Sequence, residues 1–261
     1  MKYFLGVDIG SATTKVVLLS SNETKDNILG YAIRETGSDG NKTALDLIDD
    51  LLKTHNISLK DINSIVATGY GRIKVDFTDK SKTEISCHAK GINFLFPDAR
   101  TVIDIGGQDS KVIKIGKNGA VLDFVMNDKC AAGTGRFLEI MSKVLQVSFD
   151  EFGEIHLKTS DYVDITNICT VFAESEIITL ISEGVPKEKI IKGINYSVAK
   201  RAVALVKRVG IDQEVVMSGG VAKNIGVVKA LEELIGVSIK TPHEPQIVGA
   251  LGAALFAKEL S

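Results

Sequence analysis

The chain of 261 residues is 44% hydrophobic and 25% charged, and its formal net charge is −2. These values allow one large hydrophobic core or two smaller ones, and the charge balance offers no basic surface for nucleic acid or anionic lipid. No apolar run approaches the roughly 20 residues of a membrane span, Asp8 interrupts any signal-peptide pattern, and three cysteines are an odd number for a secreted disulfide framework. We therefore expect a cytoplasmic protein without a membrane or nucleic-acid partner.

An internal repeat is the first informative feature along the chain. The segment Val7–Val17 matches Ile103–Ile113 at a constant offset of 96 residues, so that Asp8 corresponds to Asp104. Each copy has the pattern strand, glycine turn, polar loop, strand, which predicts a β-hairpin with an acid and hydroxyls at its tip. One copy alone would indicate no more than an ordinary turn. Two copies with the same acid and lysine favour two similar domains that share a ligand.

A helix, a strand and a loop are expected between the two copies. Apolar residues at helical spacing predict an amphipathic helix at Thr43–Thr54. A buried strand at Ile62–Ala67 should follow it and run into the loop Thr68–Arg72. Because this loop contains two glycines, we expect it to be able to lie over a ligand.

A second helix is predicted at Thr83–Phe96, and Pro97 ends it. The helix carries Cys87 and His88, which we interpret as a packed thiol and a structural histidine. The chain contains no Cys-x-x-Cys and no His-x-x-x-His motif, so a tetrahedral zinc site has little support.

The stretch Asn127–Glu139 combines two kinds of chemistry. Gly133, Thr134 and Gly135 open a helical pattern. Glycines at a helix start let a ligand approach the backbone, and free N–H groups there favour an anion such as phosphate. Three residues before Gly133 lies Cys130, a candidate soft ligand for a metal or cluster. The sequence therefore predicts a phosphate loop and a thiolate within one turn of chain.

Helices and short strands are expected to alternate in the rest of the chain. An extended segment at Asp161–Ile168 ends at Cys169, and a helix at Val171–Ser182 follows directly. A helical region at Pro186–Val209 carries charges that we interpret first as a solvated face and second as a partner or nucleotide contact, at Lys200, Arg201, Lys207 and Arg208. The remaining predicted elements are three strands and a last helix, at Ala120–Met126, Glu214–Met217, Val237–Lys240 and Gln246–Lys258.

The order of these features resembles the fold shared by acetate and sugar kinases, heat-shock-70 chaperones and actin. Two hairpins, a glycine-rich helix start and the turn Ser218–Ala222 carry the resemblance. It implies an α/β protein with two duplicated, RNase H-like domains around a nucleotide cleft. We expect the first domain at residues 1–97 and the second at 98–245, with the C-terminal helix 246–261 as a candidate to pack back on the first.

Three longer strings sharpen this resemblance, at Asp104–Asp109, Asn127–Phe137 and Cys169–Glu176. They are similar to the ATP-dependent activators of 2-hydroxyacyl-CoA dehydratases, and the resemblance covers essentially the whole chain. The same broad family includes ATPase subunits of benzoyl-CoA reductase. What the resemblance implies is a homodimeric iron–sulfur ATPase in which ATP binding and hydrolysis drive one electron into the dehydratase. A ferredoxin or flavodoxin would be the electron donor.

The resemblance also implies one [4Fe-4S] cluster between the subunits, held by Cys130 and Cys169 of each subunit. Residue chemistry is consistent with that arrangement, because the cluster needs four thiolates and one chain has three cysteines. Two chains that give two thiolates each are the simplest closed solution. Both cysteines precede helical patterns, and a helix N-terminus stabilises a thiolate. Either one alone would be interpreted as a buried structural thiol.

For the nucleotide, ATP or ADP, Asp8 and Asp104 are expected to face each other across the cleft and to hold Mg²⁺ through water. Gln108 is a candidate to orient the attacking water. The remaining expected contacts are two phosphate loops, the Lys15 countercharge, the helix start and an adenosine-binding turn: Gly10, Ser11, Ala12, Thr13, Thr14, Lys15, Gly106, Gly107, Gly133, Thr134, Gly135, Ser218, Gly219, Gly220 and Val221.

Other functions stay open at this point. A reductase ATPase subunit would share the same motifs. A small-molecule kinase of the same fold would transfer a phosphoryl group to a sugar or carboxylate, but it gives no reason for the cysteine pair. An actin-like assembly or chaperone module ranks last, because 261 residues leave no room for a separate peptide-binding domain.

Overall fold

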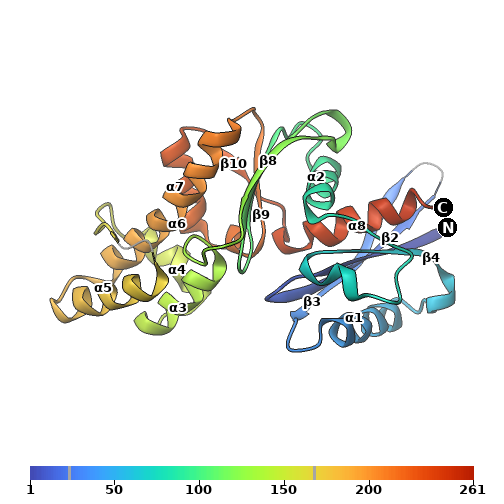
Figure 1. Ribbon diagram of the computed structural model, residues 1–261, viewed down its shortest axis with the longest axis horizontal. Helices are drawn as coiled ribbons and strands as arrows, with labels where there is room; N and C mark the ends of the chain where they lie inside the picture. The colour runs from blue at the N-terminus through green and yellow to red at the C-terminus, as the bar shows by residue number, and fades with distance from the viewer. Residues whose placement is uncertain (23–24, 167–168) are drawn as a thin grey trace. The chain divides into compact units, whose positions relative to one another are not determined.

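A computed structural model describes residues 1–22, 25–166 and 169–261 of the protein (Figure 1). The chain divides into two compact units. The first unit comprises residues 1–99, 115–122 and 246–261, and the second comprises residues 100–114 and 123–245. No helix in the described part of the chain has the length and apolar character needed to cross a membrane.

The first unit is built on a mixed five-stranded sheet with the order β3-β2-β1-β4-β5. Its strands, taken in chain order from β1 to β5, are Lys2–Ile9, Thr13–Ser21, Asp26–Glu35, Ile62–Thr68 and Lys80–Ser81. β1 pairs antiparallel with β2 and parallel with β4, and in this register Asp8 lies between Lys15 and Thr68. The predicted hairpin is therefore confirmed, and the parallel strand adds a hydroxyl beside the acid.

The second sheet repeats this arrangement strand for strand, in the order β8-β7-β6-β9-β10. Its strands, from β6 to β10, are Thr101–Ile105, Ser110–Ile115, Val121–Asn127, Val215–Ser218 and Ile239–Lys240. β6 pairs antiparallel with β7 and parallel with β9, which places Asp104 between Lys111 and Ser218. The repeat detected in the sequence is thus a repeat of structure, and the predicted fold class is confirmed.

The described residues of the first unit form three α-helices, α1 (Gly40–Thr54), α2 (Glu84–Leu95) and α8 (Val248–Lys258). The second unit has five among its described residues, α3 (Gly135–Leu145), α4 (Phe149–His156), α5 (Thr170–Ser182), α6 (Lys187–Val209) and α7 (Ile225–Ile235). α1 buries the predicted apolar stripe against one face of the first sheet, and α8 covers the other face. The hydrophobic effect therefore closes a separate core on each side of this sheet.

Small residues let α8 pack backbone against backbone in the first unit. A Cβ at Gly6 in β1 would overlap the carbonyl oxygen of Ala250, and a Cβ at Gly252 would overlap that of Cys87 in α2. The alanine- and glycine-rich composition of this helix therefore has a packing reason, because larger side chains would hold these elements apart. α8 also brings its N-terminal turn next to the end of β1.

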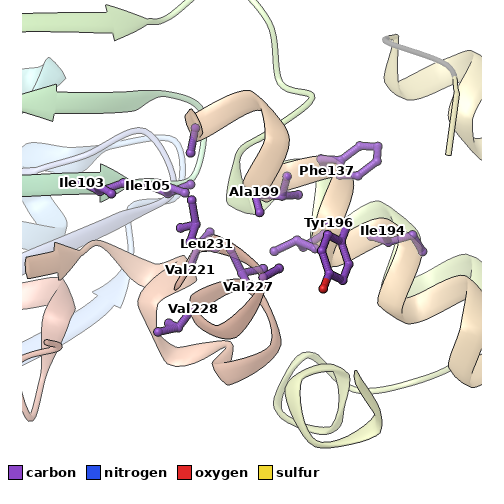
Figure 2. Packing of buried hydrophobic residues seen from close by; sticks show 14 of the residues in the cluster. Ile103, Ile105, Phe137, Ile194, Tyr196, Ala199, Val221, Val227, Val228 and Leu231 are labelled. Carbon is purple, nitrogen blue, oxygen red and sulfur yellow. The ribbon is translucent and has the colours of Figure 1, made fainter. Parts of the chain in front are cut away.

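The core of the second unit joins its sheet to α3, α6 and α7 (Figure 2). Ile103 and Ile105 come from β6, Phe137 from α3, Ala199 from α6 and Leu231 from α7, and all five are almost fully buried. This burial is consistent with the strand predicted at the start of Ile103–Ile113 and with the helical pattern that begins at Gly133.

Some expectations from the sequence differ from the structure. β3 and α4 were not predicted; β3 is an edge strand whose residues are mostly half-buried, so it lacks a clear alternation. Residues 161–166 of the expected extended segment lie in no helix or strand, and residues 167–168 lie outside the described residues. α3 begins only at Gly135, after a turn at Gly133, so Cys130 does not lie at a helix start as predicted.

Burial of His156 in the second unit makes stability depend on pH. The ring is 1% exposed and its Nδ1 lies 3.3 Å from Asn195 Nδ2. Burial, aided by the charge of Lys192, lowers the pKa of His156 from 6.5 to about 4. Because the unfolded chain binds this proton first, stability should fall as the pH falls from about 6.5 towards 4.

Between pH 7 and pH 5 we expect this group to cost about 1–2 kcal/mol of unfolding free energy. Urea denaturation at both pH values measures the loss. The variant His156→Gln does not titrate and should lose less over the same interval. An equal loss in the variant would assign the acid sensitivity to other groups.

Candidate functional site

The tip of the first hairpin is a turn closed by the backbone. Gly10 N–H donates to the carbonyl of Thr13 at 3.1 Å, and Lys15 Nζ lies 3.4 Å from Asp8 Oδ2 across the hairpin. Asp8 is 7% exposed, so its charge is held in a poorly solvated position beside a cation. Ser11 and Ala12 are the exposed residues of the tip.

Thr14 does not match its expected role as a hydroxyl donor to phosphate. Its side chain is fully buried, and its Oγ1 lies 3.0 Å from Oγ1 of Thr36. Thr36 in turn donates to the carbonyl of Gly10 at 2.8 Å. The hydroxyl of Thr14 therefore anchors the turn, because the alternating register points it into the unit.

The tip of the second hairpin has the same turn and an additional acid. Gly106 N–H donates to the carbonyl of Asp109 at 2.9 Å, and Lys111 Nζ lies 3.0 Å from Asp104 and 2.6 Å from Asp109. Lys111 is 3% exposed. Sequence reasoning missed Lys111 and Asp109 as site residues, although the repeat had aligned Lys111 with Lys15.

Two predicted loops meet in the second unit. Gly135 N–H donates to the carbonyl of Gly106 and Arg136 N–H to that of Gly107, both at 2.8 Å, and Ser110 Oγ donates to the carbonyl of Gly133 at 2.7 Å. The first amides of α3 are thus bonded to the Gly106–Gly107 loop. The expectation that they are free for phosphate is wrong.

The polar groups of Thr134, the residue before α3, also form local hydrogen bonds. Its N–H and its hydroxyl both donate to the carbonyl of Ala131, and the side chain is fully buried. The left-handed turn at Gly133, with φ +97°, folds the chain back so that these groups meet. The structure therefore brings the predicted loop residues together through the backbone.

A second pair of equivalent turns was not recognised in the sequence. Ser218, at the end of β9, donates its hydroxyl to Asp104 Oδ1 at 2.7 Å, and Gly219 follows with φ +85°. In the first unit Thr68 ends β4, and Gly69 follows with φ +86°. Glycine adopts this left-handed conformation without the steric strain that a side chain would cause.

Both of these glycines lie against the acid of their own unit. A Cβ at Gly69 would overlap Asp8 Oδ1, and a Cβ at Gly219 would lie 3.0 Å from Asp104 Oδ1. Each acid is therefore enclosed between a lysine and a glycine turn. The Thr-Gly and Ser-Gly pairs were the available signal, but a two-residue match is too short to detect.

The remaining residues predicted to contact the nucleotide differ in their exposure to solvent. Gln108 is exposed and Gly220 begins a short 3₁₀ helix. Val221 is 1% exposed and belongs to the hydrophobic core, so its side chain is closed to a ligand. Only its backbone can take part in the predicted adenosine turn.

The three cysteines lie in three different environments. Cys87 is fully buried in α2, and burial raises the pKa of its thiol to about 12. Cys130 is half-buried against the core of the second unit, and Cys169 is exposed as the N-cap residue of α5. Burial disfavours a thiolate and a helix start favours it. Cys87 is therefore the thiol least suited to bind a soft metal centre.

Arg201 differs from the expected solvated face of α6. A Cβ at Gly133 would lie 2.7 Å from Arg201 Cδ, and the guanidinium lies 5.8 Å from the centre of the Phe137 ring and donates to Ser197. Burial lowers the pKa of Arg201, and a charge interaction with Cys130 opposes that shift. A cation thus accompanies Cys130, which the helical charge pattern alone did not indicate.

Two sheets of identical topology, each with a hairpin acid enclosed by a lysine and a glycine turn, define an α/β protein of the actin-like, duplicated fold. Residues 5–257 match the BadF/BadG/BcrA/BcrD ATPase family, and the chain belongs to that family. It is therefore an ATPase.

Several proteins of known name are similar over the whole chain. The activator of lactoyl-CoA dehydratase from Anaerotignum propionicum is 49% identical over 258 residues, which are 98% of this chain and of that protein. Component A of the (R)-2-hydroxyglutaryl-CoA dehydratase of Acidaminococcus fermentans superposes with a TM-score of 0.94 at 45% identity, covering 100% of this chain and 99% of that one.

A solved structure with a bound nucleotide analogue is similarly close. The activator of the 2-hydroxyisocaproyl-CoA dehydratase from Clostridium difficile, with bound ADPNP, has a TM-score of 0.92 at 46% identity, covering 99% of this chain and 95% of that one. A ROK family glucokinase from Streptomyces griseus has a TM-score of 0.59 at 12% identity, over 98% of this chain and 99% of that one. The glucokinase therefore shares the fold alone.

The buried lysine of the second hairpin leads to a prediction about stability. Lys111→Met leaves Asp104 and Asp109 without their cation and should cost about 3–5 kcal/mol of unfolding free energy. Lys15→Met removes one longer and more solvated pair and should cost about 1–2 kcal/mol. Urea denaturation of both variants measures the difference, and equal losses would contradict the assigned environments.

Proposed function

We propose that the chain is the ATP-dependent activator of a 2-hydroxyacyl-CoA dehydratase and delivers single electrons to that enzyme. The observation that carries the proposal is the difference in burial among its cysteines: Cys130 is half-buried and Cys169 is exposed, whereas Cys87 is buried. Sequence identity of 46–49% to proteins named as activators of such dehydratases supports it. A ferredoxin or flavodoxin is the proposed electron donor.

Each hairpin tip offers groups that suit magnesium–ATP. Asp8 and Asp104 supply the carboxylate oxygens that Mg²⁺ prefers, and each acid is fixed by a lysine. The close approach of Gly69 to Asp8 fits this role, because a side chain at position 69 would overlap the Asp8 carboxylate. When bound, the metal would neutralise phosphate charge. The residues of the chain orient the acids and bring backbone amides near the phosphates; Gln108, exposed on its loop, is the proposed group that orients the attacking water.

The nucleotide contacts of the proposal are the hairpin and turn backbones, at Gly10, Ser11, Ala12, Thr13, Gly106, Gly107, Gly219 and Gly220. The hydroxyls of Thr14, Thr134 and Ser218 stabilise the turns around the site, because each forms a hydrogen bond within its own unit. For this function we propose two ATPase domains. The first comprises residues 1–97 and the C-terminal helix 246–261, and the second comprises residues 98–245.

A [4Fe-4S] cluster fits the cysteine chemistry if two chains share it. Cys130 and Cys169 provide two thiols, and Cys87 is too buried to add a thiolate. Cys169 lies at the N-terminus of α5, a position that suits an anionic cluster. When bound, the cluster would accept and release one electron. Arg201 would add a positive charge beside Cys130.

The surface of α5 supports a homodimer around this cluster. The helix begins at the exposed Cys169 and carries four exposed apolar side chains, Val171, Phe172, Ile178 and Ile181. Apolar residues gathered on one surface helix are typical of an interface. A second copy related by two-fold symmetry would place its own cysteine pair opposite the first.

The proposed metal site is tested by removing one charge at a time. Asp8→Asn and Asp104→Asn should each lower the rate of ATP hydrolysis by at least about tenfold, because each weakens the magnesium site. The control Asp46→Asn changes an exposed acid of α1 and should hydrolyse ATP normally. Steady-state hydrolysis measures the effect. A wild-type rate in either site variant contradicts the proposed arrangement.

The proposed cluster is tested by three matched substitutions. Cys130→Ser and Cys169→Ser should lose most of the iron and the visible absorbance of anaerobically purified protein, whereas Cys87→Ser should retain both. The dimer should weaken with the cluster, since metal binding and assembly are linked. Iron and sulfide analysis measures the cluster content, and sedimentation measures the dimer. Equal iron content in all three variants would contradict the assignment of Cys130 and Cys169 as cluster ligands.

The dehydratase partner is tested by reconstitution. Protein purified without oxygen is mixed with a candidate 2-hydroxyacyl-CoA dehydratase, a reductant and ATP. Dehydration that depends on both this protein and ATP supports the proposal. Activity with a benzoyl-CoA reductase and none with any dehydratase would replace the proposed partner.

A further inference from the structure

His88 and the acid of the first hairpin both lie close to Gly249 of α8, although the sequence context of His88 suggested only a structural histidine. The residue is 7% exposed and belongs to α2. A Cβ at Gly249, in the first turn of α8, would lie 3.1 Å from Asp8 Oδ2 and 3.2 Å from His88 Nε2. The same missing methyl group would therefore contact both side chains.

The close packing of α2 on α8 produces this arrangement. A Cβ at Gly91 would overlap the carbonyl oxygen of Val248, and a Cβ at Gly252 would overlap that of Cys87, so the two helix backbones are in direct contact. His88 follows Cys87 and lies one turn before Gly91 on the same helix. The backbone contact of the two helices therefore brings the buried His88 ring next to Gly249.

Asp8 is therefore approached by several elements of the first unit. Lys15 reaches Oδ2 at 3.4 Å from β2, and the turn at Gly69 lies against Oδ1. Gly249 approaches Oδ2 from α8, and His88 Nε2 of α2 lies near the same glycine. A carboxylate that binds a metal, directly or through water, needs such supporting groups to fix its orientation.

We propose that His88 is a positioning residue for the nucleotide site, which holds the Asp8 carboxylate in the orientation that binds magnesium, and that Gly249 is required to leave room for this contact. The inference rests on the proposed role of Asp8 in binding magnesium. His88 acts through Asp8 and does not itself touch the nucleotide. Its loss should weaken metal binding more than nucleotide binding.

The test measures the Mg²⁺ concentration needed for half-maximal binding of a fluorescent ATP analogue to the full-length protein, together with nucleotide affinity in the absence of metal. His88→Leu keeps an apolar volume and removes the ring nitrogens. It should raise the Mg²⁺ requirement by about 10- to 100-fold and leave metal-free affinity unchanged. His88→Gln, which can place an amide nitrogen near Nε2, should restore most of the wild-type response.

His55→Leu is the matched control, because His55 ends α1 in the same unit and lies away from Asp8 against Gly30. It should show the wild-type Mg²⁺ response. Gly249→Ala is a second, independent variant and should also raise the Mg²⁺ requirement, since its methyl group would press on both side chains. Thermal unfolding of every variant checks that the fold is kept.

A wild-type Mg²⁺ response in folded His88→Leu, or in Gly249→Ala if the first variant does not fold, overturns the inference. Asp8→Asn in the same assay separates this failure from failure of the proposed function. A shifted response in Asp8→Asn with none in His88→Leu removes only the role of His88. A wild-type response in Asp8→Asn removes the proposed magnesium role itself.

Discussion

The pairing of a poorly solvated acid with a lysine across each hairpin is the interaction on which the rest of the structure depends. Asp8 with Lys15 and Asp104 with Lys111 are register partners on neighbouring strands. A slip of one residue would move each side chain to the opposite face of its sheet, and an unpaired charge in these surroundings is costly. The pairs therefore fix the strand register, and the register sets where the loops that follow can lie.

The sequence predicted most of what depends on local order. The hairpins, α1 and the apolar face of α3 follow from alternation and helical spacing in short segments. The relation between Thr68-Gly69 and Ser218-Gly219 escaped detection because long insertions in the second unit destroy the constant offset. The surroundings of His88 and Arg201 escaped detection for another reason: their neighbours, Gly249 and Gly133, are remote in the chain, and a helical pattern alone does not show which side chains meet across a core.

The cysteines show the same limit in chemical form. Spacing gave Cys130 and Cys169 equivalent positions before helices, yet only Cys169 is an N-cap residue, and the left-handed turn at Gly133 separates Cys130 from α3. The thiol at Cys130 is instead accompanied by a cation from α6. Two thiols of one chain thus have different neighbours, a helix N-terminus in one case and an arginine side chain in the other.

The place of α8 has a consequence for the order of folding during synthesis. This helix fills one face of the first sheet, yet its residues leave the ribosome more than two hundred positions after β1. The contacts that complete the second unit all lie within residues 100–245. The part made later can therefore reach its final packing first, whereas β1 and β2 must wait with an uncovered apolar face, which nascent-chain chaperones would be expected to recognise.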